Sequence, residues 1–327
     1  MNPESPRPAA DGGAQSESVS VLTWADEQHL FLTQTFDALL VSPDRKHVSR
    51  CLYLAHKIQS GCKHSPEGVL AALHLNRTAR YQHVKELFAG VLCELLGQKV
   101  GMTPSARLLL ICAALTQDIG MLDLQDEKLD KQVTALTDQQ KRIITKHPHN
   151  GRQILERAGV KDSVWLSAVE QHHERPDGNG YPQALTAEAI SQPAKLLSVA
   201  DIYVAMMRPR GDRPAMFPRE AMKQVFLARG HQVDNDIARQ LIEVIGMHPP
   251  GIWVKLINGE VGVVVAQGST PAFPRVATVL SHDGEHLGAA VIRDTSQRSY
   301  TLVEAVTAPF HFNLSAILAD LWPRLPA

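Results

Sequence analysis

The 327-residue sequence has no excess of charge of either sign and few cysteines. Lysine and arginine number 33 against 34 aspartates and glutamates, so no global basic field exists to recruit nucleic acid or an anionic membrane. The four cysteines lie in apolar, helix-like segments and form no C-x-x-C pair, which argues against a zinc ribbon and a disulfide framework. We therefore expect reduced, buried side chains at Cys51, Cys62, Cys93 and Cys112.

Long hydrophobic runs and common enzyme fingerprints are also missing. The opening MNPESPRPAADGGAQSES carries no apolar signal region, and no later run approaches the ~18 apolar residues of a membrane span. No G-x-S-x-G elbow, Walker loop or dinucleotide fingerprint occurs. These absences predict a cytoplasmic protein with no membrane and no nucleic-acid partner.

Helical periodicity dominates the chain up to Gly246. Apolar residues recur at helical spacing in about eight successive segments with short connections. One of these segments opens with Thr137 and Gln140 in the spacing of a capping box. The pattern predicts a mainly α fold with an all-α core.

After Gly246 the period becomes alternating, as in β-strands. Asn258-Gly259 lies between two β-rich runs and is the strongest short hairpin signal that a sequence offers. We therefore expect a small β-rich module with a structural or docking role. The predicted division is a flexible tail at 1–19, an N-terminal helical unit at 20–76, a central helical domain at 77–247 and the β-rich module at 248–327.

Histidines and carboxylates interrupt several of the apolar helices. Two adjacent histidines lie where a helix gives way to the loop ERPDGNGYP. Asp201 lies inside an apolar helix, where a carboxylate is costly to bury unless it is paired or binds a cation. Imidazoles and carboxylates together are the ligands of zinc, iron or manganese. The candidate metal ligands are Asp118, His147, His172, His173 and Asp201.

The motif HHERPDGNGYP, together with KHPHNGRQIL and LLSVADIYVAMMRPRGDRP, resembles the HD-GYP branch of the HD superfamily of metal-dependent phosphohydrolases. The resemblance covers about residues 81–246. It implies a helical bundle that holds two or three iron or manganese ions and hydrolyses cyclic di-GMP, a bacterial second messenger, by attack of a metal-bridging hydroxide. It also implies that Gly180, Tyr181 and Pro182 form a loop that binds the nucleotide or another signalling protein. Arg213 would bind a phosphate, or else belong to a solvated surface.

Three positions depart from the pattern of that family. Its H-D-x-G-K signature reads Q-D-I-G-M here, so Gln117 replaces a histidine ligand and Met121 replaces a lysine. Lys85 aligns with a further histidine ligand on the preceding long helix. In the family, the first ion uses both missing histidines with Asp118 and Asp201, whereas the second ion uses a set that is intact here. That second set is Asp118, His147, His172 and His173.

These departures predict a degenerate centre with a single iron, manganese or zinc ion. A further hypothesis places the Lys85 ammonium where the missing ion would lie, so that it neutralises Asp118 and Asp201. A metal-free pocket whose residues hydrogen-bond one another is the alternative. The corresponding functions are a cyclic di-GMP signalling protein that binds nucleotide or a partner with lost or reduced phosphodiesterase activity, an active phosphodiesterase with a reduced metal centre, or a scaffold with a vestigial pocket.

Overall fold

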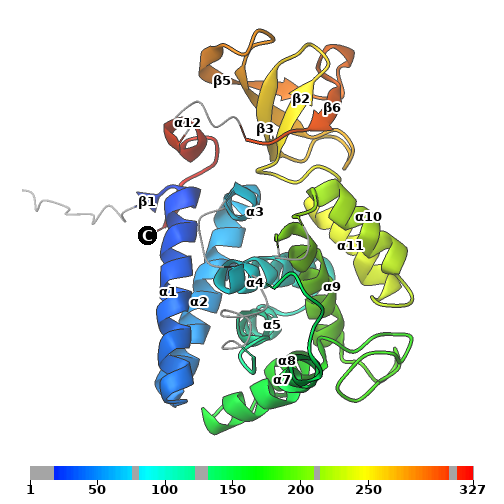
Figure 1. Ribbon diagram of the computed structural model, residues 1–327. Helices are drawn as coiled ribbons and strands as arrows, with labels where there is room; N and C mark the ends of the chain where they lie inside the picture. Colours follow the sequence, from blue (N-terminus) through cyan, green and yellow to red (C-terminus); the bar gives the residue numbers. More distant parts are fainter. Residues whose placement is uncertain (1–17, 76–80, 122–131, 210–213, 309–314, 327) are drawn as a thin grey trace, which may run out of the picture.

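The computed structural model describes residues 18–75, 81–121, 132–209, 214–308 and 315–326. It confirms a mainly α fold, in which a helical bundle is followed by a small sheet (Figure 1). The helices are α1 (Val21–Val41), α2 (Arg45–His64), α3 (Pro66–Leu75), α4 (Tyr81–Lys99), α5 (Pro104–Thr116), α7 (Asp138–Arg157), α8 (Ser163–Gln171), α9 (Gln192–Met207), α10 (Pro218–Ala228), α11 (Asn235–Ile245) and α12 (Ser315–Ala319).

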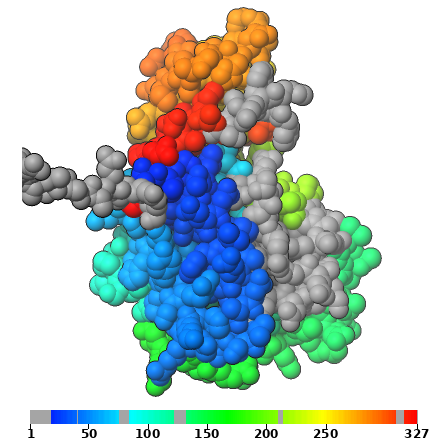
Figure 2. Space-filling model, turned by 90° about the vertical axis from the view of Figure 1, so that its left-hand side faces the viewer, coloured from blue at the N-terminus to red at the C-terminus, as the bar shows by residue number. Residues whose placement is uncertain are grey.

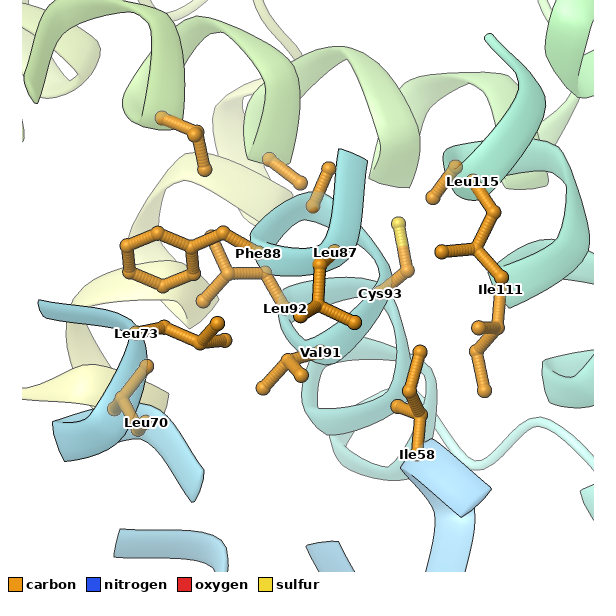
Figure 3. Close-up of a cluster of buried hydrophobic side chains, with 14 of the residues drawn as sticks. Ile58, Leu70, Leu73, Leu87, Phe88, Val91, Leu92, Cys93, Ile111 and Leu115 are labelled. Atoms are coloured by element: carbon orange, nitrogen blue, oxygen red, sulfur yellow. The ribbon is translucent and has the colours of Figure 1, made fainter. Parts of the chain in front are cut away.

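Helix α4 forms the centre of the bundle. It contacts α1, α2, α3 and α5, and also α9 and α11. Figure 3 shows its Leu87, Phe88 and Leu92 side chains among residues of the neighbouring helices, such as Ile58 of α2 and Ile111 of α5. Because most of α4 is surrounded, a charged side chain on its buried part must find its partner inside the protein.

Helix α7 begins as the sequence predicts and turns one face to the core. The side chain of Thr137 accepts from the Gln140 N–H while the Gln140 side chain accepts from the Thr137 N–H, so the capping box is confirmed. Its buried residues include His147, Gly151 and Leu155, which recur every four positions. This spacing aims His147 into the bundle.

The C-terminal module is one antiparallel sheet with the strand order β5-β4-β3-β2-β6. The predicted hairpin turn at Asn258-Gly259 joins β2 to β3, and Gly259 has the positive φ of 87° that such turns require. The strands are β2 (Trp253–Leu256), β3 (Val261–Ala266), β4 (Arg275–Leu280), β5 (His286–Asp294) and β6 (Leu302–Ala305), with a 3-10 turn at Arg298–Tyr300.

The two ends of the described chain meet on the N-terminal helices. Strand β1 (Ser18–Val19) pairs antiparallel with β7 (Leu325–Pro326), and the nearby Trp322 donates its indole N–H to the carbonyl of Val265 in β3 at 2.9 Å. Figure 2 shows these C-terminal residues between the blue N-terminal helices and the orange β-rich module. Assigning Ser18 and Val19 to a flexible tail was wrong, because their partner strand lies some 300 residues further along the chain.

The four cysteines are free and buried, as expected. Among the described helices, none combines the length and the apolar character that crossing a membrane would require. The predicted domain boundaries stay predictions. Helix α3 contacts α4 and β3, which lie beyond the boundaries predicted after residues 76 and 247.

Candidate metal centre

Asp118 reaches the interior because a glycine two residues later allows two backbones to meet. The carboxylate follows the C-terminal end of α5, and its side chain is fully buried. A Cβ atom on Gly120 would lie 2.2 Å from the carbonyl oxygen of His147 and 2.7 Å from the N of Gly151. Only glycine therefore lets this turn pack on α7, and that packing brings Asp118 next to His147.

Two buried histidines turn unprotonated nitrogens toward this carboxylate. The Nδ1 atom of His147 lies 2.6 Å from the carbonyl oxygen of Ile144, and that of His172 lies 2.7 Å from the carbonyl oxygen of Val169. A carbonyl oxygen can only accept, so Nδ1 carries the proton in both rings and each Nε2 keeps a lone pair. The backbone has thus fixed the tautomer that a metal ligand needs.

The distances between these lone pairs fit a bound ion. The two Nε2 atoms are 3.3 Å apart, and Asp118 Oδ1 lies 3.4 Å from that of His147 and 3.9 Å from that of His172. Tetrahedral ligands with metal–nitrogen bonds of about 2.0–2.1 Å are separated by about 3.3–3.4 Å. Asp118 Oδ1 has no hydrogen-bond partner among the described residues. Three mutually repelling acceptors at this spacing fit a cation between them.

His173 completes a four-residue cluster with these side chains, in which the candidate ligand atoms all lie within 4.8 Å of one another. Burial lowers the pKa of His147 to about 3 and the pKa of His172 below its ordinary value. Burial and the two neighbouring imidazoles lower the pKa of His173 well below its usual range. All three rings are therefore neutral near pH 7, the state in which imidazole binds a metal.

A lysine occupies the other side of the Asp118 carboxylate. Lys85 Nζ, on the central helix α4, lies 2.5 Å from Asp118 Oδ2 and 2.8 Å from Asp201 Oδ1 on α9. Burial acts to raise the pKa of Asp118, but the Lys85 ammonium and the imidazoles of His147 and His172 together outweigh it, and the pKa is lowered. One oxygen of the Asp118 carboxylate therefore faces the histidines, and the other contacts Lys85. The pocket has no place for an ion between the two carboxylates, because the ammonium is there.

Two further polar side chains are buried near this ion pair. Glu86 follows Lys85 on α4, and burial together with the nearby Asp118 raises the pKa of its carboxyl well above the ordinary range. Gln117 immediately precedes Asp118. The side chains of Glu86 and Gln117 are both fully buried. The side-chain oxygens of Glu86 and both amide atoms of Gln117 have no hydrogen-bond partner within the described part of the chain.

The loop of Gly180, Tyr181 and Pro182, here called the GYP loop, rests directly on the histidine cluster. The centroids of the Tyr181 and His173 rings are 4.8 Å apart. The backbone N–H of Tyr181 donates to the carbonyl of His173 at 3.2 Å. The buried Glu174 accepts from the N–H groups of Gln183 at 2.6 Å and Leu185 at 2.9 Å. A Cβ on Gly180 would lie 2.4 Å from the Arg175 N, so this position requires glycine. The loop geometry is therefore tied to the cluster.

The structure brings most of the predicted site residues together. Pro182, which follows a cis peptide bond, continues the loop from Tyr181. Met121 is buried and its N–H donates to the Asp118 carbonyl, so it closes the turn without contributing a charge. Arg213 lies outside the described residues. The assignment of ligand roles to these side chains stays a prediction.

The family model for the HD domain matches residues 69–237, slightly more than half of the chain. The chain belongs to the HD domain family. The chain shares its fold with a solved HDG"Y"P protein from Bdellovibrio bacteriovorus, which has a TM-score of 0.57 and 19% identity over 71% of this chain and 73% of that one. The HD match begins within α3 (Pro66–Leu75).

Curated relatives extend the comparison. The chain is 28% identical over 229 residues to the cyclic di-GMP phosphodiesterase PA4108 of Pseudomonas aeruginosa, covering 70% of this chain and 55% of the relative. It is 30% identical over 142 residues to the 3'3'-cGAMP-specific phosphodiesterase 1 of Vibrio cholerae, covering 43% and 32%. The chain thus spans about half or less of the length of these relatives.

Sequence reasoning missed two side chains of this HD site. Glu86 could have been noticed as a second charged residue beside Lys85 in the apolar segment VKELFAGVL. Glu174 was read only as one letter of a motif, but it fixes the loop through two N–H groups. Neither role follows from sequence spacing. The partners of Glu174 lie nine and eleven residues away, and the raised pKa of Glu86 depends on the residues that bury it.

Proposed function

We propose that this HD protein is a cyclic di-GMP signalling protein that binds one divalent ion and the nucleotide, with phosphodiesterase activity that is lost or greatly reduced. The observation that carries the proposal is the position of Lys85 Nζ between Asp118 and Asp201. A two-metal mechanism needs a second ion to stabilise the attacking and leaving oxygens. One fixed ammonium supplies positive charge but no open coordination position, so the nucleotide can bind without the assembly that cleaves it.

Charge supports one ion over a metal-free pocket. One ammonium faces two carboxylates while the imidazoles are neutral, so this buried group carries a net negative charge. Uncompensated buried charge is costly. Asp118, His147, His172 and His173 would hold the ion, which when bound supplies Lewis acidity and positive charge toward a phosphate. The side chains themselves hold neutral ligand nitrogens in place and keep water from the cluster.

The nucleotide class comes from the relatives, whose names include cyclic di-GMP and 3'3'-cGAMP phosphodiesterases. The test is metal content after purification without chelator, followed by calorimetric titration with each nucleotide and turnover assays with added Mn²⁺ or Fe²⁺. We expect about one ion per chain and binding of cyclic di-GMP without turnover above background. Turnover matching that of PA4108, assayed in parallel, would make the protein an active hydrolase. Absence of binding to either nucleotide would leave the vestigial scaffold.

Tyr181→Ala is expected to weaken cyclic di-GMP binding about tenfold or more, because stacking of a base on an aromatic ring contributes about 1–3 kcal/mol. Tyr181 is partly exposed and rests on His173, so the variant should stay folded. Tyr53→Ala on α2, where the tyrosine is half exposed, is the matched control and should bind as the parent does. Equal affinity of the Tyr181 and Tyr53 variants would remove the GYP loop from nucleotide binding.

A further inference from the structure

The arrangement around Asp118 is that of a two-cation centre in which one cation is an amino-acid side chain. Asp118 Oδ1 faces the histidine cluster, and Oδ2 contacts Lys85 Nζ. A carboxylate that bridges two cations is the feature that joins the ions of a two-metal site. Here the second cation is tethered to helix α4 and is shared with Asp201.

The burial of Lys85 shows that this contact is not an ordinary surface ion pair. Its side chain is 5% exposed, and those of Asp118 and Asp201 are 0% and 6% exposed. Removing three charged groups from water is expensive, so such a cluster persists only when each charge has its partner. Lys85 lies within ion-pair distance of both carboxylates at once, as a metal ion in the same place would, and the one remaining negative charge is left for a cation on the histidine side.

Gln117 provides an independent sign that this place is altered. Its amide is fully buried beside Asp118, yet neither amide atom has a hydrogen-bond partner among the described residues. Buried polar atoms are normally satisfied, and an unsatisfied pair requires a specific explanation. The residue that precedes Asp118 in the chain thus holds buried polar atoms that no described residue satisfies.

We infer that Lys85 is a built-in replacement for one of two metal ions, and that positions 85 and 117 together limit this HD centre to a single divalent ion. The inference rests on the one-ion site of the proposed function. A tethered ammonium cannot dissociate or be chelated, so the Asp118–Asp201 side of the pocket keeps its charge whatever the metal supply. Only the histidine side responds to metal.

The test is the double variant Lys85→His with Gln117→His, which exchanges the ammonium and the amide for two neutral ligands. We expect the Mn²⁺ content to rise from about one to about two ions per chain in equilibrium dialysis with Mn²⁺ alone. Electron paramagnetic resonance should then show the exchange coupling of a manganese pair, which a single ion cannot produce. Lys99→His is the matched control, because Lys99 is on the same helix and pairs with Glu243 at a half-exposed site; it should keep one ion.

A folded double variant with a single uncoupled ion would overturn the inference. If the double variant does not fold, Lys85→Met in the presence of Mn²⁺ decides the matter. Removal of a neighbouring positive charge should tighten binding of the remaining ion roughly tenfold or more, and unchanged affinity would count against a cation at this position. Nucleotide binding is measured separately, so its absence in the parent protein would remove the proposed function without touching the stoichiometry.

Discussion

Lys85→Met should lower the free energy of unfolding by about 3–5 kcal/mol when chelator is present, the cost of breaking a buried ion pair by removing one partner. The substitution would leave Asp118 and Asp201 as neighbouring buried carboxylates with no cation between them. Methionine has a similar length and can fill the space, so the loss would report charge rather than a cavity. Urea denaturation followed by circular dichroism measures it.

Lys99→Met serves as the control for Lys85→Met. Both lysines are on α4 and both pair with carboxylates, but Lys99 is 43% exposed and Lys85 is 5% exposed. Exposed ion pairs contribute little to stability, so the control should unfold at nearly the urea concentration of the parent protein. Similar midpoints for the two variants would show that the Lys85 ammonium does not hold the carboxylates in the folded state. Added Mn²⁺ should return part of the lost stability to the Lys85 variant.

His172→Ala is expected to abolish binding of the ion, reducing metal content from about one per chain to less than a tenth. His172 Nε2 lies 3.3 Å from that of His147, and its Nδ1 is held by the Val169 carbonyl, so the substitution removes a ligand nitrogen whose position the backbone sets. A ligand that binds only the folded state at 100 times its dissociation constant stabilises that state by about 2.7 kcal/mol. Zn²⁺ or Mn²⁺ should therefore raise the melting temperature of the parent protein but not of the variant.

His149→Ala provides the comparison for this loss. His149 lies on α7 two residues from His147, but it is half exposed and faces Glu170 at 3.3 Å instead of the cluster. This variant should retain its ion and its metal-dependent melting temperature. If His172→Ala bound metal as well as His149→Ala does, the ion would have to lie elsewhere. If the parent protein showed no metal-dependent shift, the metal-free pocket would be favoured.

Local sequence signals determined most of the secondary structure. The capping box at Thr137 and Gln140 and the turn at Asn258-Gly259 act within a few residues, so they operate wherever the chain folds. The motif around His172 also identified the family and the candidate ligands, since the chemistry needs those residue types at that spacing. The sequence alone therefore predicts these features.

Long-range packing decided the rest. Ser18 becomes a strand only because β7 returns to it from the far end of the chain, which no local window contains. The raised pKa of Glu86 follows from complete burial and the nearby Asp118, not from the identity of its neighbours in sequence. The placement of Lys85 Nζ between two carboxylates required α4, the end of α5 and α9 to converge. The sequence therefore determined which candidate ligands and charges this HD protein possesses, and tertiary structure decided which of them meet at the Asp118 carboxylate, because distances between separate helices are fixed only by packing.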